Sequence, residues 1–112
     1  MYLDDRLNGR KERRLPVVVV VNLAPLERVS PERHERTYTD NISAHGARLR
    51  STYAWQLGER AEITPASGET PVRGEVVYCQ RLDNDYFFVG VKIRESRILW
   101  SILRRFDGID AA

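Results

Sequence analysis

Five consecutive valines, Val17 to Val21, directly follow Pro16 in the N-terminal part of the chain. Valine is branched at Cβ, which restricts its side chain in a helix and favours the pleated surface of a β-strand. Proline is tolerated in front of such a run because it suits the first residue of a strand. The valines therefore predict a first strand from about Leu15 to Ala24, which needs neighbouring strands to cover its edges.

The chain from there to about residue 93 has the patterns of further short strands. Small and apolar residues at Ala47, Leu49 and Ser51 alternate with Arg48 and Arg50, which is typical of a half-buried strand. Similar alternation or β-branched composition, bounded by turn-forming residues, predicts four more strands, at residues 36–40, 60–64, 72–81 and 86–93. The sequence LDND between the last two favours a tight hairpin.

The apolar period changes from two to three or four after residue 93. Ser96 is a suitable N-cap for a helix, and Gly108 a suitable stop. The predicted helix of about three turns has one apolar face, formed by Ile98, Leu99, Ile102, Leu103 and Phe106. Six short strands followed by one amphipathic helix predict an all-β fold, a small antiparallel barrel or sandwich that the helix covers.

Length, charge and cysteine content narrow the class of protein. A chain of 112 residues is expected to form one domain, and its 18 basic and 16 acidic residues leave a net charge of only +2. That balance argues against a protein that coats itself in nucleic acid. The lone Cys79 excludes an internal disulfide and a cysteine-based zinc site, and fits a reducing compartment. With no signal-like start and no apolar run of ~20 residues, we expect a cytoplasmic protein.

The residues that carry catalytic chemistry are few. His34 and His45 lie in a charged loop and a turn, without a second histidine or cysteine at metal-binding spacing. Cys79 follows Tyr78 in a predicted strand, where a thiol is more often a packing side chain than a nucleophile. No phosphate-binding glycine loop is present. We therefore expect neither an enzyme nor a metal or cofactor.

Two polar segments remain, RKERR at residues 10–14 and NISAHG at residues 41–46. Taken alone, the first is typical of a solvated strand entry and the second of a hairpin turn. A guanidinium group, however, can also donate to two phosphate oxygens or to the O6 and N7 atoms of guanine, and can stack on a base. Both interpretations stay open on composition alone.

The order and spacing of the two segments resemble the PilZ domain family, whose motifs are RxxxR and (D/N)xSxxG. The resemblance extends over about residues 10–106, since the strands and the final helix follow in the family's order. It implies a six-stranded antiparallel split barrel at residues 10–107, after a flexible segment at residues 1–9. It also implies that the protein binds the bacterial second messenger cyclic di-GMP without reacting with it. The ligand-binding residues carried over from the motifs are Arg10, Arg14, Asn41, Ser43 and Gly46.

The resemblance further suggests a mechanism and leaves alternatives. The arginine segment would become ordered over the barrel when the dinucleotide binds, and would pass the signal to a separate protein. Flagellar, polysaccharide-synthesis, pilus and transcriptional partners all fall within the family's range. One alternative is a protein-interaction module that has lost nucleotide binding. Another is a small nucleic-acid-binding barrel that uses Arg48, Arg50, Tyr53 and Trp55 as a stacking surface.

Overall fold

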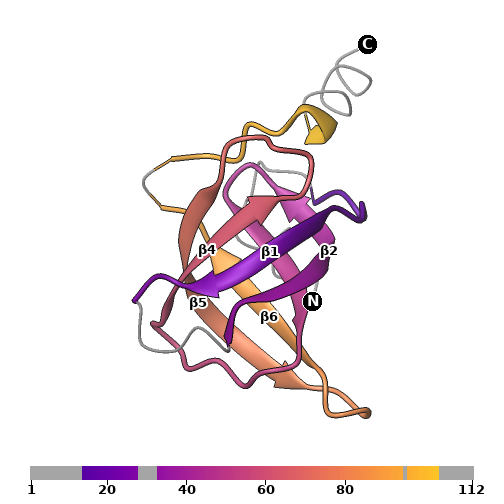
Figure 1. Cartoon of the computed structure of the whole chain (residues 1–112), viewed down its shortest axis with the longest axis vertical. Coiled ribbons are helices and arrows are strands. Elements are labelled where there is room, and N and C mark those ends of the chain that lie inside the picture. The colour runs from indigo at the N-terminus through magenta and orange to yellow at the C-terminus, as the bar shows by residue number, and fades with distance from the viewer. Residues whose placement is uncertain (1–13, 28–32, 95, 104–112) are drawn as a thin grey trace, which may run out of the picture.

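The alternating segments close into a barrel of six antiparallel strands (Figure 1). The computed structural model describes residues 14–27, 33–94 and 96–103. Around the barrel the strands follow the order β1-β2-β3-β6-β5-β4. Their bounds are β1 (Val20–Pro25), β2 (Glu35–Ser43), β3 (Gly46–Ser51), β4 (Arg60–Pro65), β5 (Val72–Arg81) and β6 (Phe87–Lys92). The predicted fold class, a six-stranded antiparallel barrel, is confirmed.

The core lies inside the barrel and takes one face of each strand. The alternation predicted for β3 is confirmed, because Ala47, Leu49 and Ser51 are buried while Arg48 and Arg50 lie on the outer face. Burial of each aliphatic side chain contributes about 1.5–3 kcal/mol, so these inward positions hold the barrel together. Aliphatic side chains that are at most 1% exposed come from every strand: Val21, Leu23, Ile42, Leu49, Ile63, Val76 and Val89.

The valine run does not form one regular strand. The first residue predicted for this strand, Leu15, was therefore wrong. Strand β1 begins at Val20, and Val18 is 67% exposed. Over the preceding residues the buried Thr39 hydroxyl takes part in the pairing: it donates to the Val17 carbonyl at 2.9 Å and accepts from the Val19 amide at 2.9 Å. A side chain thus replaces part of the backbone ladder, which a propensity for strand does not reveal.

Strand β2 is longer than predicted, and the segment NISAHG is only partly a turn. Asn41, Ile42 and Ser43 belong to the end of β2, and Gly46 begins β3, so the turn itself is residues 44–45. The β2–β3 register shifts between Thr39 and Asn41, which is a β-bulge. Such an extra residue bends its strand and re-aims the neighbouring side chains.

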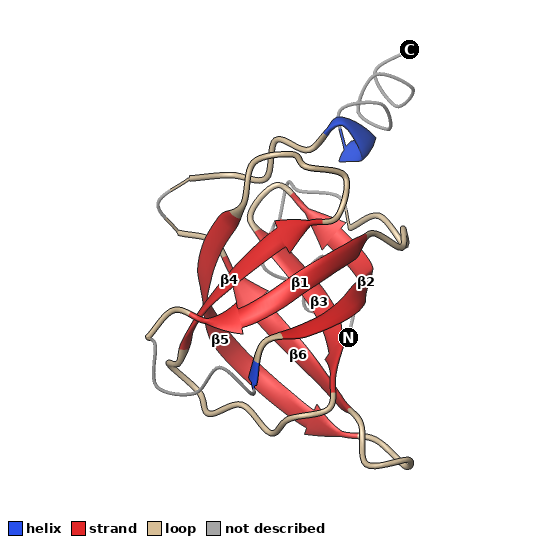
Figure 2. Ribbon diagram, viewed as in Figure 1, coloured by secondary structure: helices blue, strands red, loops and turns tan. Residues whose placement is uncertain are grey.

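The predicted start of the C-terminal helix at Ser96 was wrong. Residues 97–100 are not helical. Within the described residues of this segment the helix is 101–103, at the opposite end of the long axis from the β5–β6 turn (Figures 1 and 2). The reason is tertiary: the Ile98 amide donates to the Ala44 carbonyl at 2.7 Å instead of joining a helix. Residues 104–107 of the predicted helix lie outside the described residues. Across the described ranges no helix is long and apolar enough to cross a membrane.

Trp100 anchors this C-terminal segment to the barrel. It is 1% exposed, and its Nε1 donates to the Thr70 carbonyl at 2.8 Å. Next to it the Ser101 amide donates to Glu69 Oε1 at 2.7 Å. A carboxylate at the first helical residues accepts from amides that have no partner within the helix, which favours the helix start at this place.

An ion pair between Arg33 and Glu59 joins the segment before β2 to the loop before β4. Arg33 Nη1 lies 2.6 Å from Glu59 Oε2, both side chains are about one-fifth exposed, and the guanidinium lies 4.4 Å from the Trp55 ring centre. The hydrogen bond from Arg33 lowers the pKa of Glu59 below its ordinary value of 4.5. A charge-assisted bond to a largely buried carboxylate is typical of a structural contact.

This ion pair predicts part of the acid sensitivity of the fold. Because the pKa of Glu59 is lower in the folded chain than in the unfolded one, the stabilisation is complete above pH ~4.5 and is lost as the pH falls through the folded value. We expect Glu59→Gln to reduce the difference in unfolding free energy between pH 7 and pH 3, measured by urea unfolding. The control is Asp85→Asn, whose exposed pair with Arg81 should leave the difference unchanged. Equal pH profiles for wild type and Glu59→Gln would contradict the assignment.

Candidate functional site

The two polar motifs meet on the outside of the barrel where the chain enters it. Leu15 forms an isolated bridge with Ile42: its amide donates to the Ile42 carbonyl at 2.8 Å and its carbonyl accepts from the Ile42 amide at 3.0 Å. The residues on either side are thereby placed next to each other, and Arg14 Nη1 donates to Asn41 Oδ1 at 3.4 Å. The second arginine of RxxxR and the first residue of NxSxxG are therefore in contact. Arg10 lies outside the described residues.

The Arg14–Asn41 contact is long and exposed, so it holds neither group tightly. A guanidinium with several donors and an amide with both a donor and an acceptor then face the same solvent-accessible space. Phosphate oxygens or the edge of a purine base could replace this contact. The pair is suited to recognising an anionic, hydrogen-bonding ligand.

Ser43 and Gly46 lie at the far end of the same motif and pair with each other across the hairpin. Ser43 is buried at 5% exposure, whereas Asn41 and Gly46 are half-buried. A Cβ atom built on Gly46 would lie 3.4 Å from the Val91 carbonyl oxygen and 3.7 Å from Ser43 Oγ, which are ordinary contact distances. The barrel therefore leaves room for an alanine at position 46, and packing does not explain the glycine.

A second guanidinium, that of Arg48, borders the site and is absent from the motif-based prediction. Arg48 pairs in register with Asn41, and it donates to both oxygens of the Asp40 carboxylate, at 2.8 and 2.7 Å. These hydrogen bonds raise the pKa of Arg48, so it stays cationic. Its guanidinium also lies 4.3 Å from the centre of the Phe88 ring, a cation–π contact. Arg48 is thus held over an aromatic ring beside Asn41.

An aromatic ring continues the same row of residues on the next two strands. Gly90 pairs with Arg48 on one side and with Tyr78 on the other. A Cβ on Gly90 would lie 2.3 Å from Tyr78 Cε2, so the tyrosine ring covers the glycine backbone directly. Across the paired strands β2, β3, β6 and β5, the outer face therefore presents a row of four residues with polar and aromatic groups: Asn41, Arg48, Gly90 and Tyr78.

One residue of the stacking surface predicted for a nucleic-acid-binding barrel is buried in the structure. Trp55 is 4% exposed, and Arg33 covers its ring, so it is not available to stack on a base. Arg50 packs against aromatic side chains of the protein itself, 4.7 Å from the Tyr86 ring centre, and Arg50 Nη1 donates to the Tyr38 hydroxyl at 3.0 Å. The predicted surface of Arg48, Arg50, Tyr53 and Trp55 is therefore not one exposed stacking platform.

Candidate metal ligands do not gather anywhere in the described part of the chain. Within residues 14–27, 33–94 and 96–103, no group of three or more His, Cys, Asp or Glu side chains could hold a metal ion. Cys79 is half-buried, and its sulfur accepts a hydrogen bond from the Trp55 amide at 3.4 Å, as expected for a packing residue.

Comparison with known proteins matches the whole arrangement to one family. The family model described as PilZ domain matches residues 8–106. Among solved structures, the chain is similar to the Bacillus subtilis inhibitor of motility MotI/DgrA, with a TM-score of 0.63 and 19% identity. The match covers 92% of this chain and 53% of that one, so the chain spans about half the length of its structural neighbour. No curated protein matches the chain by sequence.

Proposed function

The chain belongs to the PilZ domain family, and on this basis we propose that it is a receptor for cyclic di-GMP. The observation that carries the proposal is the contact between Arg14 and Asn41, 27 residues apart, which joins the two family motifs on one outer surface. PilZ domains are in general receptors of this dinucleotide and not enzymes. We propose the same for this protein, with the ligand bound and released unchanged.

The proposed binding mode uses one set of groups from the arginine motif and one set from the barrel. Arg14, and by the motif Arg10, would donate to phosphate oxygens or to the O6 and N7 edge of a guanine. Asn41 would donate to and accept from a base edge, and Gly46 would let the ligand approach the backbone closely. Arg48 on Phe88 adds a flat, permanently charged group beside Asn41, on which a second ring can stack.

We further propose that the receptor acts as an adaptor. Binding of the dinucleotide would order the arginine segment over the barrel, and the altered surface would be read in the cytoplasm by a separate effector protein. The fixed entry point supports this, because the backbone is tied to β2 from Leu15 onward. Residues 1–13, which include the predicted flexible segment, lie outside the described residues. Backbone relaxation measured with and without the ligand tests this step, and residues 2–14 that are already rigid without ligand would contradict it.

Titration calorimetry with cyclic di-GMP tests the proposal directly. We expect saturable binding, with a stoichiometry that tells whether one dinucleotide or an intercalated pair is bound. Cyclic di-AMP is the control, because adenine lacks the O6 acceptor and the N1–H and N2–H donors that the site is proposed to read. No heat of binding with cyclic di-GMP, or equal affinity for both dinucleotides, would reject guanine-specific recognition.

A second candidate function is a protein-interaction module that does not bind nucleotide. The burial of Ser43 favours it, because a residue that is only 5% exposed offers a ligand little accessible surface. So does the neutral Asn41, since an amide accepts a weaker hydrogen bond from guanine than a carboxylate does. The same titration decides between the two functions.

Gly46→Ala separates the role of this residue in binding from its role in folding. Because a Cβ at this position has room in the barrel, we expect the free energy of unfolding to stay the same or to rise by up to ~1 kcal/mol. If the ligand approaches the backbone at this point, the added methyl group weakens binding of cyclic di-GMP by at least about tenfold, roughly the cost of one lost hydrogen bond. Wild-type affinity in this variant would remove Gly46 from the site.

A further inference from the structure

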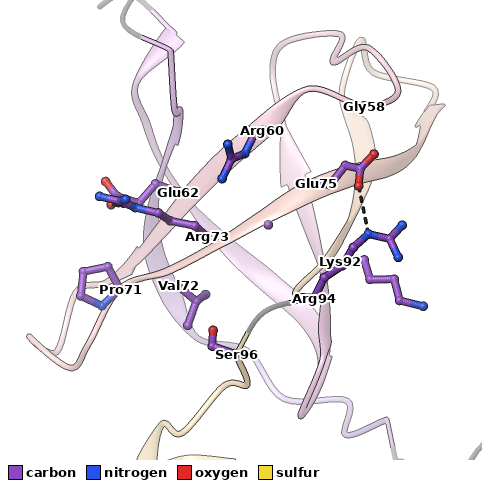
Figure 3. A pocket seen from close by; sticks show the side chains of 11 residues that line it. Gly58, Arg60, Glu62, Pro71, Val72, Arg73, Glu75, Lys92, Arg94 and Ser96 are labelled. Carbon is purple, nitrogen blue, oxygen red and sulfur yellow. Dashed lines mark hydrogen bonds and ion pairs between the residues drawn. The ribbon is translucent and has the colours of Figure 1, made fainter.

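A polar groove lies on the barrel beside the second PilZ motif, and one of its lining residues, Lys92, pairs in register with Gly46. Its volume is about 810 Å³, and it runs over β4, β5 and the end of β6 (Figure 3). The charged side chains around it are Arg60, Glu62, Arg73, Glu75, Lys92 and Arg94. None of these residues belongs to the motifs that define the proposed dinucleotide site.

Among the described residues that line the groove, four are cations and two are anions. Two of the cations form ion pairs with the anions, and the other two form none. Arg73 is paired with Glu62 at 3.1 Å and Arg94 with Glu75 at 3.0 Å. Arg60 and Lys92 flank Glu75 in register on the two neighbouring strands, but their side chains make no hydrogen bond or ion pair with any other described residue. With the two pairs neutralised, the described residues that line the groove retain two positive charges.

The spacing of those two charges indicates an extended chain rather than a compact anion. Arg60 and Lys92 lie on strands separated by one other strand, so their backbones are about 10 Å apart. The Glu75 carboxylate lies between them in register and repels a phosphate or sulfate at the centre, whereas separate carboxylates can contact each cation away from Glu75. Carboxylates on alternate residues of an extended segment are spaced by ~6.5 Å, and those four apart by ~13 Å, which brackets the separation once the long cationic side chains adjust.

One wall of the groove is joined to the turn of the dinucleotide motif. Arg94 and Ser96 belong to this wall. The residues just outside them are hydrogen-bonded to the turn: the Ile93 amide donates to the His45 carbonyl at 2.9 Å, and the Ile98 amide donates to the Ala44 carbonyl at 2.7 Å. A displacement of the turn on ligand binding would therefore displace the wall as well.

We propose that this groove docks an extended acidic segment of a partner protein, and that the dinucleotide changes the affinity for that segment through the turn at residues 44–45. The docking rests on the groove itself, and only the coupling rests on the proposed receptor function. Thermodynamic linkage makes the coupling reciprocal, so the segment must change the affinity for the dinucleotide by the same factor.

Fluorescence anisotropy with a labelled peptide of alternating glutamate and serine residues tests the docking. A peptide of alternating lysine and serine is the control probe. We expect the wild-type protein to bind only the acidic peptide, and Arg60→Glu/Lys92→Glu to weaken that binding at least tenfold. The matched variant Arg36→Glu/Arg81→Glu makes the same change in net charge at exposed positions outside the groove, and should weaken it less than threefold. No binding by wild type, or an equal loss in both variants, would overturn the proposal.

Calorimetry with cyclic di-GMP on the same proteins keeps the two proposals apart. The single variant Arg60→Glu is added here and is expected to bind the dinucleotide with wild-type affinity, because Arg60 lies on β4, which pairs with neither motif strand, whereas Lys92 is the in-register partner of Gly46. A wild-type protein that binds the peptide but not the dinucleotide would reject the receptor function and retain the groove. For a protein that binds both, peptide affinity unchanged by saturating dinucleotide would overturn the coupling.

Discussion

Arg14→Ala is expected to weaken binding of cyclic di-GMP by about 10- to 150-fold, the equivalent of ~1.5–3 kcal/mol for a lost charge-assisted hydrogen bond. The fold should be unaffected, because the Arg14 side chain is exposed and its contact with Asn41 is 3.4 Å long. The neighbouring Leu15–Ile42 bridge, which holds the chain in place, uses backbone atoms only. Titration calorimetry gives the affinity, and urea unfolding shows whether the fold is intact.

Two further variants test the specificity of this result. Arg14→Lys keeps the charge but loses the planar fork of donors, and is expected to bind with an affinity between those of wild type and Arg14→Ala. Arg36→Ala removes an exposed arginine from β2 away from Asn41, and should leave the affinity within about twofold of wild type. If Arg14→Ala binds as tightly as Arg36→Ala does, Arg14 has no part in the site.

The barrel was predictable from the sequence because its strands are short and each buries only one face. A strand with one buried face imposes strict alternation, as at Ala47, Leu49 and Ser51, and this pattern is visible without any tertiary information. Close pairing of the strands in a small barrel then leaves few arrangements for such a chain. The order and spacing of two family motifs singled out Arg14 and Asn41 as ligand-binding residues, and the contact between their side chains became visible only in the folded chain.

The position of Arg48 beside Asn41 could not be predicted from the sequence, because it depends on a change of register between β2 and β3. Without the bulge between Thr39 and Asn41, Asp40 would be the direct cross-strand partner of Arg48, and Asn41 would point to the other face. Where a bulge falls depends on the packing of both strands, and sequence alternation does not mark it. The same applies to Thr39, whose hydroxyl bonds to Val17 and Val19 became visible only with the chain folded.

Trp100→Ala is expected to lower the free energy of unfolding by about 3–5 kcal/mol, as large-to-small changes of a buried aromatic residue do. The ring is 1% exposed, and its hydrogen bond to the Thr70 carbonyl is lost as well. The control is the adjacent Leu99→Ala: Leu99 is 57% exposed and should cost less than ~0.5 kcal/mol. If Trp100→Ala fails to fold, Trp100→Phe keeps most of the ring and should still cost more than Leu99→Ala.

This pair of variants also discriminates between the two descriptions of the C-terminal segment. A regular helix from Ser96 with the predicted apolar face would bury Leu99, and its replacement would then be the costly one. The structure instead buries Trp100 and ties the Ile98 amide to the turn at Ala44, so the order of the two costs is reversed. Urea unfolding of both variants at pH 7 measures the two costs. A larger loss for Leu99→Ala than for Trp100→Ala would favour the helix, and would remove the backbone link between the motif turn and the groove.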